Sequence, residues 1–228
     1  IKRKTKTPSM GGIGILVGIG IGVMMFSLSL DVLWVFFAMV MFGCIGFYDD
    51  LKSFLKGRNQ GLSAAQKFML QACVSFVLLF LFSYLIRGLS FFEYVFYSFV
   101  MIGTSNATNL TDGLDGLLAG CSLITLLGFT FLFQLSGDLS AQILCNIVMF
   151  SVAAFFLFNR NPASIFMGDT GSLLLGAGFA AFAIVLNNVW VLLPLGAVYI
   201  IETLSVMIQV VYYKWTKKRV FLMAPLHH

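Results

Sequence analysis

Long apolar stretches separated by short polar segments set the pattern of this chain of 228 residues. Each stretch approaches the ~20 residues that a helix needs to cross the hydrocarbon core of a bilayer. The eight expected spans are Gly11–Leu30, Val32–Tyr48, Gln66–Ile86, Phe91–Thr108, Leu117–Leu135, Ser140–Phe158, Ser172–Leu186 and Val189–Tyr213. A transmembrane barrel is disfavoured, because its strands would give alternating runs of only ~10 residues. We therefore predict an all-α, polytopic transmembrane helical bundle, with residues 1–228 forming a single integral membrane domain.

The composition agrees with a membrane protein and excludes an ordinary soluble domain. Hydrophobic residues make up 60% of the chain and charged residues 10%, whereas a soluble domain carries about 25% charged residues. The formal net charge of +5 does not indicate a nucleic-acid partner, because Lys and Arg accumulate on the cytoplasmic loops of membrane proteins. The four cysteines lie singly in apolar segments, without the spacing of a metal site or a disulfide framework.

The basic residues fix an orientation for these spans. With the N-terminus inside, thirteen of the fourteen Lys and Arg residues fall in inner segments, and only Arg87 falls outside. Such an asymmetry supports both the orientation and the number of spans. The outer loops are too short to house a soluble domain, so any chemistry is expected on the cytoplasmic face.

One polar cluster stands out between two apolar stretches. Residues 106–116 read N-A-T-N-L-T-D-G-L-D-G and gather two carboxylates, two amides, two hydroxyls and two glycines. Polar groups this dense are costly beside apolar segments unless they bind something or face water. We expect Asp112 and Asp115 at the start of the fifth span, where residues three apart share a helix face. Capping of that helix explains one acid but not the whole cluster.

Two further acidic points fall on the same predicted face. Asp49 and Asp50 are expected at the C-terminal end of the second span, where acids oppose the helix dipole. Asp169 lies in M-G-D-T-G-S, where Thr170 and Ser172 are expected to cap the seventh span. A helix N-terminus favours phosphate, and Mg2+ takes oxygen ligands and keeps substrate phosphates in its shell. The sequence therefore predicts a magnesium–diphosphate site at the cytoplasmic face.

Two other features remain open at this stage. His227 and His228 are the only histidines, and such a pair is either the start of a purification tag or a source of imidazoles near a diphosphate. The preceding K-K-R-V-F-L-M-A-P argues against a tag. Glu202 is an acid inside the last span, which indicates either function or a buried hydrogen bond between helices.

Five motifs in one order resemble a known family. They are T-P-S-M-G-G (7–12), F-Y-D-D-L-K (47–52), N-A-T-N-L-T-D-G-L-D-G (106–116), F-M-G-D-T-G-S (166–172) and R-V-F-L-M-A-P-L-H-H (219–228). They resemble the polyprenyl-phosphate N-acetylhexosamine-1-phosphate transferases, and the M-A-P-x-H-H ending favours the muramoyl-pentapeptide branch. That family normally has a further span before and after this region. The chain therefore resembles a core fragment that lacks the first and last spans.

The resemblance implies a reaction and a place for it. The reaction is transfer of phospho-MurNAc-pentapeptide from UDP-MurNAc-pentapeptide to undecaprenyl phosphate, which yields lipid I and UMP in peptidoglycan synthesis. It implies Mg2+ as cofactor, the lipid bilayer of the bacterial inner (cytoplasmic) membrane as the location, a cytoplasmic N-terminus and a possible homodimer. The alternative is a polyprenyl-phosphate GlcNAc-1-phosphate transferase.

The resemblance also implies roles for particular residues. The residues expected at the reacting groups are Asp49, Asp50, Asp169, His227 and His228. The residues expected to bind substrate are Lys4, Thr7, Lys52, Lys67, Asn109, Asp112, Asp115 and Asn159. Within these sets Asp169 is the expected magnesium ligand, with Asn159 near the metal. Asp49 is expected to orient or deprotonate the lipid phosphate for direct attack, while a two-step route through an aspartyl-phosphate stays open.

Two rival classes make distinguishable predictions. A membrane prenyltransferase would also hold a diphosphate with Asp pairs and magnesium, but it would show two D-x-x-x-D motifs rather than D-D and D-x-x-D. A transporter would place acids near the bilayer midplane beside broken helices, and only Glu202 fits that pattern. Formation of UMP from a UDP-sugar separates the enzyme from the transporter.

Overall fold

The structure is a computed structural model that describes residues 7–56 and 61–227, and all regular structure in these ranges is helical. The helices run in the order α1 (Gly12–Met25), α2 (Leu30–Leu55), α3 (Ala64–Leu85), α4 (Phe91–Thr111), α5 (Leu117–Ser136), α6 (Leu139–Asn159) and α7 (Gly168–Val185). A 3-10 turn η2 (Val189–Val191), the short α8 (Leu192–Leu195) and α9 (Ala197–Thr216) follow. The predicted all-α bundle is confirmed.

Each of the eight expected spans contains a helix, but not every helix is a complete span. Within the described residues, five helices are long and apolar enough to cross a membrane: α2, α3, α5, α6 and α7. A sixth is added if η2–α8 and α9 count as one bent span. The helix α1 has only 14 residues, and α4 carries the polar run Thr104–Thr111. The count of eight is therefore approximate for this part of the chain.

The last expected span is broken. Residues Val189–Leu195 and Ala197–Thr216 meet at 83°, so the helix axis turns sharply at Gly196. The hydroxyl of Thr125 on α5 donates to the carbonyl of Leu195 at 2.9 Å. A backbone acceptor freed by the break is thereby satisfied inside the apolar bundle, as buried polar groups require.

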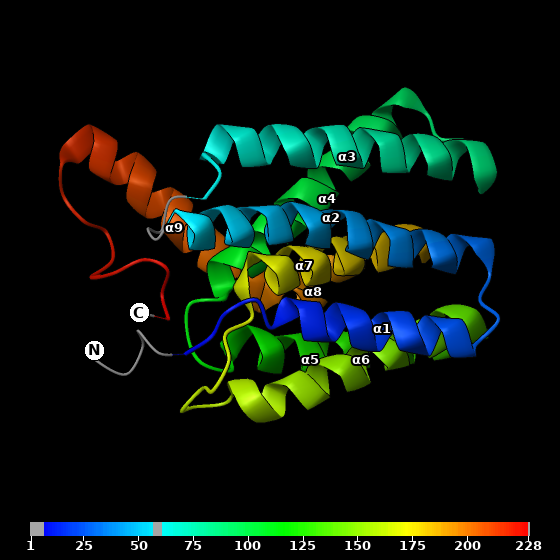
Figure 1. Ribbon diagram of the computed structural model, residues 1–228. Helices are drawn as coiled ribbons and strands as arrows, with labels where there is room; N and C mark the ends of the chain where they lie inside the picture. The colour runs from blue at the N-terminus through cyan, green and yellow to red at the C-terminus, as the bar shows by residue number, and fades with distance from the viewer. Residues whose placement is uncertain (1–6, 57–60, 228) are drawn as a thin grey trace.

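The centre of the bundle is α7. Every residue from Thr170 to Ile184 is buried, and Figure 1 shows α7 between α2 and α1. Small residues permit the close contact with α2. A methyl group placed on Gly46 would meet the carbonyl oxygen of Asp169 at 2.1 Å, so only glycine fits there. This contact fixes the first turn of α7, which carries Asp169, directly against α2.

The outer surface of the bundle is strongly apolar. Large side chains such as Phe76, Phe80, Phe131 and Phe150 are exposed on α3, α5 and α6. An exterior of this kind is compatible with lipid rather than with water. The protein is a multi-pass membrane protein.

Two expected helix boundaries were wrong. The helix α2 continues to Leu55 rather than ending at Tyr48, so Asp49 and Asp50 lie inside the helix and the argument from its C-terminal dipole does not apply. The helix α4 continues to Thr111 rather than ending at Thr108, with Asp112 as its C-cap, while α5 begins at Leu117 as expected. Asp112 and Asp115 therefore lie in the turn between two helices and do not share a helix face.

The polar motifs gather at one end of the bundle. In Figure 1 the described N-terminal segment, the loops α4–α5 and α6–α7, and the C-terminal tail all lie at the left. The first turn of α7 and the start of α3 lie at the same end. The folding topology thus brings together segments that are far apart in the sequence.

Candidate active site

A lysine joins two carboxylates that come from different helices. The ammonium of Lys67 lies 2.6 Å from Asp49 Oδ2 on α2 and also contacts Asp169 Oδ2 on α7. The side chain of Lys67 is 17% exposed, that of Asp49 is 10% exposed and that of Asp169 is 27% exposed. These short contacts between largely shielded charges tie α2, α3 and α7 together at one point.

The position of Lys67 follows from the way α3 begins. Ser63 accepts a hydrogen bond from the backbone N–H of Gln66 at 3.2 Å, and Gln66 Oε1 accepts from the N–H of Ser63 at 3.1 Å. This is a complete capping box, which fixes the first turn of a helix. Lys67 is the next residue, so its backbone is fixed at the end of the bundle where the polar motifs gather.

The second oxygen of Asp169 is held from α4. Asn109 Nδ2 donates to Asp169 Oδ1 at 2.7 Å and to Ser172 Oγ at 2.9 Å. Thr108 Oγ1 donates to the carbonyl of Ser172 at 2.8 Å. Four helices, α2, α3, α4 and α7, thus converge on the carboxylate of Asp169.

Asp50 supplies the N-terminal cap of α7. Its Oδ1 accepts from the N–H of Asp169 at 3.1 Å, and its Oδ2 accepts from the N–H and hydroxyl of Thr170 at 2.9 and 2.6 Å. The expectation that Thr170 and Ser172 cap this helix was wrong, since its N-cap residue, Met167, makes no side-chain cap bond. A carboxylate at this place satisfies free amide groups and the positive end of the helix dipole.

Carboxylates outnumber cations in the immediate surroundings of Asp169, where Lys67 is the cation in contact. Burial, together with the charges of Asp169 and Asp50, raises the pKa of Asp112 to about 7, against a small lowering by the N–H of Gly168. The ordinary pKa of an aspartate is about 3.9. A site that holds a carboxyl group partly protonated at neutral pH favours the arrival of a cation.

The carboxylates around Asp169 suit magnesium only in a site shared with a substrate. No group of three or more His, Cys, Asp and Glu side chains within the described ranges is arranged to hold a metal ion. Mg2+ usually binds through one or two carboxylates and completes its shell with waters and substrate phosphates. The carboxylates at the start of α7 therefore fit a magnesium ion that is shared with a diphosphate, and they do not fit a closed metal cage.

A polar hollow lies between the α4–α5 turn and the α6–α7 loop. Its volume is about 200 Å³, and its lining residues are Asp112, Gly113, Leu114, Asp115, Asn159 and Phe166. Asn159 Oδ1 accepts from the N–H of Gly116 at 3.0 Å, and Nδ2 donates to the carbonyl of Ile165 at 2.9 Å. Asp115 Oδ2 accepts from the N–H of Ala163 at 3.1 Å. Asn159 and Asp115 thus shape the two loops, and neither bonds to Asp169.

His227 returns to the site along the C-terminal tail. Its Nδ1 lies 3.3 Å from Glu202 Oε2, and the two side chains are 5% and 9% exposed. A methyl group on Gly113 would meet His227 Nε2 at 2.1 Å, so the ring lies directly on the α4–α5 turn. Glu202 was expected to serve either function or a buried hydrogen bond between helices; its observed partner, His227, lies in the tail rather than in a helix and is a predicted site residue.

The remaining predicted residues take less central places. Thr7 is half-buried in a segment that pairs with the α6–α7 loop, where Phe166 N–H donates to the carbonyl of Pro8 at 2.9 Å. Lys52 is half-buried on α2, and none of the ion pairs among the described residues includes it. Lys4 and His228 lie outside the described residues.

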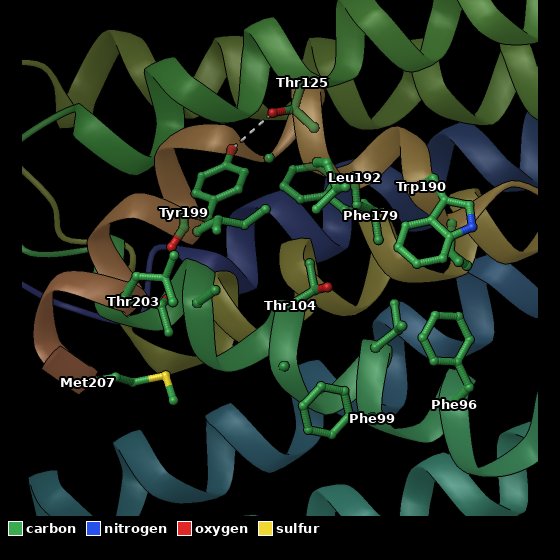
Figure 2. A pocket seen from close by; sticks show the side chains of 18 residues that line it. Phe96, Phe99, Thr104, Thr125, Phe179, Trp190, Leu192, Tyr199, Thr203 and Met207 are labelled. Atoms are coloured by element: carbon green, nitrogen blue, oxygen red, sulfur yellow. Dashed lines mark hydrogen bonds between the residues drawn. The ribbon is translucent and has the colours of Figure 1, made fainter. Parts of the chain in front are cut away.

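An apolar hollow beside the site was not predicted. It has a volume of about 390 Å³ and lies between α4, α7 and the broken span. Figure 2 shows the rings of Phe96, Phe99 and Trp190 along it and the hydroxyl of Tyr199 hydrogen-bonded to Thr125. Its α4 wall runs from Phe96 to Ala107, a length of about 17 Å at the helical rise. That wall ends close to Asn109. The break at Gly196 that creates the hollow has a local signal in Pro194, because a proline inside an apolar helix removes a backbone donor and ends or kinks the helix.

Comparisons with known proteins cover nearly the whole chain. The model of the family described as Glycosyl transferase family 4 matches residues 32–187. A phospho-N-acetylmuramoyl-pentapeptide-transferase from Staphylococcus saprophyticus subsp. saprophyticus is 40% identical over 247 residues, covering 99% of this chain and 77% of the relative. Relatives of the same name from Listeria welshimeri serovar 6b and Staphylococcus aureus are each 39% identical over 246 residues. The Listeria match covers 100% of this chain and 76% of the relative. The Staphylococcus aureus match covers 99% of this chain and 77% of the relative.

Proposed function

The chain belongs to glycosyl transferase family 4 and, within it, to the phospho-N-acetylmuramoyl-pentapeptide transferases, and we propose that it transfers phospho-MurNAc-pentapeptide from UDP-MurNAc-pentapeptide to undecaprenyl phosphate. The products are lipid I and UMP, and the step belongs to peptidoglycan synthesis. The relatives carry the muramoyl-pentapeptide name, so neither the GlcNAc-1-phosphate alternative nor the transporter is favoured. The protein is a membrane enzyme that acts on a lipid and a nucleotide sugar.

The observation that carries the proposal is the convergence of four helices on Asp169. Phosphoryl transfer needs positioned reactants and neutralised charge more than it needs covalent help from the protein. Asp169 stands in the first turn of α7, and Asp50 holds that turn by accepting hydrogen bonds from the N–H groups of Asp169 and Thr170. Lys67 and Asn109 fix the two oxygens of Asp169, and such preorganisation avoids reorganisation during the reaction.

We assign the magnesium site to Asp169. The magnesium requirement itself is a proposal, supported by the excess of carboxylates and by their fit to an ion shared with a diphosphate. When bound, the ion would supply Lewis-acid neutralisation of the charge that develops on departing UMP. Lys67 already lies at Asp169, so its ammonium is placed to turn toward a substrate phosphate while keeping its contact with Asp49.

The chain's own groups suit a direct attack. A lipid phosphate has its second pKa at about 6 and is mostly dianionic at neutral pH, so a strong general base is not required. Its oxygen forms a bond to the sugar-side phosphorus, and the bond from that phosphorus to the oxygen of UMP breaks, with UMP keeping the electron pair. Asp49, held by Lys67, orients the lipid phosphate, and Asn109 keeps Asp169 in place. His227 and the polar hollow at Asp112 contact the donor.

The apolar hollow provides a path for the lipid acceptor. Its walls carry aromatic and aliphatic side chains with few polar atoms, and burial of such surface favours a polyprenyl chain. The α4 wall ends near Asn109, so a chain lying in the hollow would bring its phosphate toward Asp49 and Asp169. We further infer that this end of the bundle faces the cytoplasm, because within the described residues it carries every Lys and Arg except Arg87. A cytoplasmic N-terminus is part of the same proposal. A homodimer stays a prediction, which the oligomeric state of the protein in detergent would test.

The test follows UMP release by the purified protein in detergent. UMP is expected only when UDP-MurNAc-pentapeptide, undecaprenyl phosphate and Mg2+ are all present, and EDTA should abolish it. Asp169→Asn should remove activity, whereas Asp31→Asn, the same change at the opposite end of α2, should not. UMP release that is independent of the lipid acceptor, or that survives in Asp169→Asn, would contradict the proposal.

A further inference from the structure

The C-terminal tail folds back along α9 and is held there by the side chain of Gln209. After α9 ends at Thr216 the chain reverses direction, with Lys217 in the left-handed region at a φ of 56°. Gln209 Oε1 then accepts hydrogen bonds from the N–H groups of Val220 and Phe221, both at 3.0 Å. Its Nε2 donates to the carbonyl of Phe221 at 3.3 Å. One carboxamide thus makes three backbone contacts with the tail.

A second contact lies further along the same helix. Glu202 Oε2 lies 3.5 Å from the backbone nitrogen of His227 and 3.3 Å from its Nδ1. Glu202 and Gln209 are in i, i+7 relation, which places them on one face of α9 about 10 Å apart. The tail therefore runs antiparallel to α9 from Val220, at Gln209, to His227, at Glu202.

The far end of this tail reaches the candidate active site. The His227 ring lies on the α4–α5 turn at Gly113, where an added methyl group would meet the ring Nε2 at 2.1 Å. Gly113 and its neighbour Asp112 line the polar hollow. The place of the imidazole therefore depends on a segment that is not part of any helix and that α9 holds through Gln209 and Glu202.

We propose that Gln209 and Glu202 form a clamp on the C-terminal tail that positions His227 against the α4–α5 turn. Gln209 is a positioning residue: it does not touch the reacting groups and acts on the reaction through His227. This inference rests on the proposed function for its kinetic part only. A carboxamide suits the task because it offers the two kinds of hydrogen-bonding group that the tail backbone presents. Leucine loses all three contacts, while glutamate keeps the two acceptor bonds.

The first arm of the test measures the clamp itself. Hydrogen exchange of the Val220 and Phe221 amides is followed in detergent without substrate, for the parent, Gln209→Leu and Gln209→Glu. Exchange in Gln209→Leu should be faster by about tenfold or more, since three hydrogen bonds are lost, and Gln209→Glu should fall between. Gln134→Leu is the matched control, because Gln134 is exposed on α5 and its side chain makes no hydrogen bond within residues 7–56 and 61–227. It should leave the exchange of both amides unchanged. Unchanged exchange in Gln209→Leu overturns the clamp.

The second arm asks whether Gln209 acts through His227. Steady-state UMP release is compared for the parent, Gln209→Leu, His227→Ala and the double variant. Gln209→Leu should lower kcat/KM by about tenfold, and it should cause no further loss in the His227→Ala background. Equal losses in both backgrounds would overturn the positioning role. If the parent released no UMP, the proposed function would fail, and the exchange arm would still decide the clamp. Glu202→Gln, which keeps the shape, repeats both arms if Gln209→Leu does not fold.

Discussion

Replacement of Asp50 by asparagine distinguishes a helix cap from a reacting acid. The resemblance placed Asp50 beside the lipid phosphate, yet its carboxylate already accepts three hydrogen bonds from the first turn of α7. Asparagine keeps one oxygen, which can still serve Thr170, but it presents an NH2 group to the N–H of Asp169 and lacks the negative charge. The first turn of α7, and with it Asp169, should become less firmly held.

The size of the effect follows from these contacts. Loss of one hydrogen bond to a charged group costs about 1.5–3 kcal/mol, and loss of charge at a helix N-terminus costs about 0.3–1 kcal/mol. We therefore expect Asp50→Asn to lower the free energy of unfolding by about 2–3 kcal/mol, after allowance for the half-buried position. For a chain of 150–250 residues this corresponds to a fall in Tm of about 4–12 °C.

The assay is thermal unfolding in detergent, followed alongside UMP release. Thr170→Val, which removes only the hydroxyl contact, should give a smaller fall in Tm, and Asp31→Asn at the other end of α2 should give little change. Activity and Tm should fall together in Asp50→Asn. A large loss of activity with an unchanged Tm would refute the cap and return Asp50 to the chemistry.

Three further predictions concern the same cluster. Lys67→Met leaves the carboxylates of Asp49 and Asp169 without their shared cation. Loss of one partner of a largely buried ion pair should lower the free energy of unfolding by about 3 kcal/mol. A change below about 1 kcal/mol in thermal or denaturant unfolding would contradict the Lys67 bridge. The folded-state pKa of Asp112, about 7, lies above the unfolded value of about 3.9. The metal-free folded protein therefore binds an extra proton between these values and loses stability as the pH rises through that window. Asp112→Asn should be more stable than the parent in EDTA at pH 8, and the difference in Tm should vanish near pH 4; a difference that does not depend on pH would show that the group is not buried as described. Under single turnover with labelled donor and no lipid acceptor, direct attack predicts no phosphorylated aspartate, and its detection would favour the two-step route.

The sequence located the helices because apolar runs of this length have few other structures available to them. It could not locate the end of α2, since Asp49 is tolerated inside the helix only because Lys67 of α3 neutralises it. Pro194 and Gly196 do mark the break in the last span, but the arrangement that stabilises it is not visible locally. The carbonyl of Leu195 is satisfied by Thr125 from another helix, and no local pattern reveals such a partner.

The same distinction holds for the site. The dense polar run at residues 106–116 pointed to Asn109 and Asp112 because it stood out from its apolar surroundings. The sequence did not reveal that Asp50 caps a helix 120 positions later. It also did not reveal that Gln209 holds the tail. The one local signal is an amide in the apolar α9, two turns after Glu202, and an amide alone does not predict what it binds.

The most direct test of the central claim offers the protein two donors. With undecaprenyl phosphate and Mg2+, UMP release is measured in parallel from UDP-MurNAc-pentapeptide and from UDP-GlcNAc, with Asp169→Asn beside the parent. The account predicts UMP from the muramoyl donor alone and none in Asp169→Asn. UMP from UDP-GlcNAc alone would contradict the assigned donor while keeping the site, and UMP from neither donor would contradict the assigned reaction.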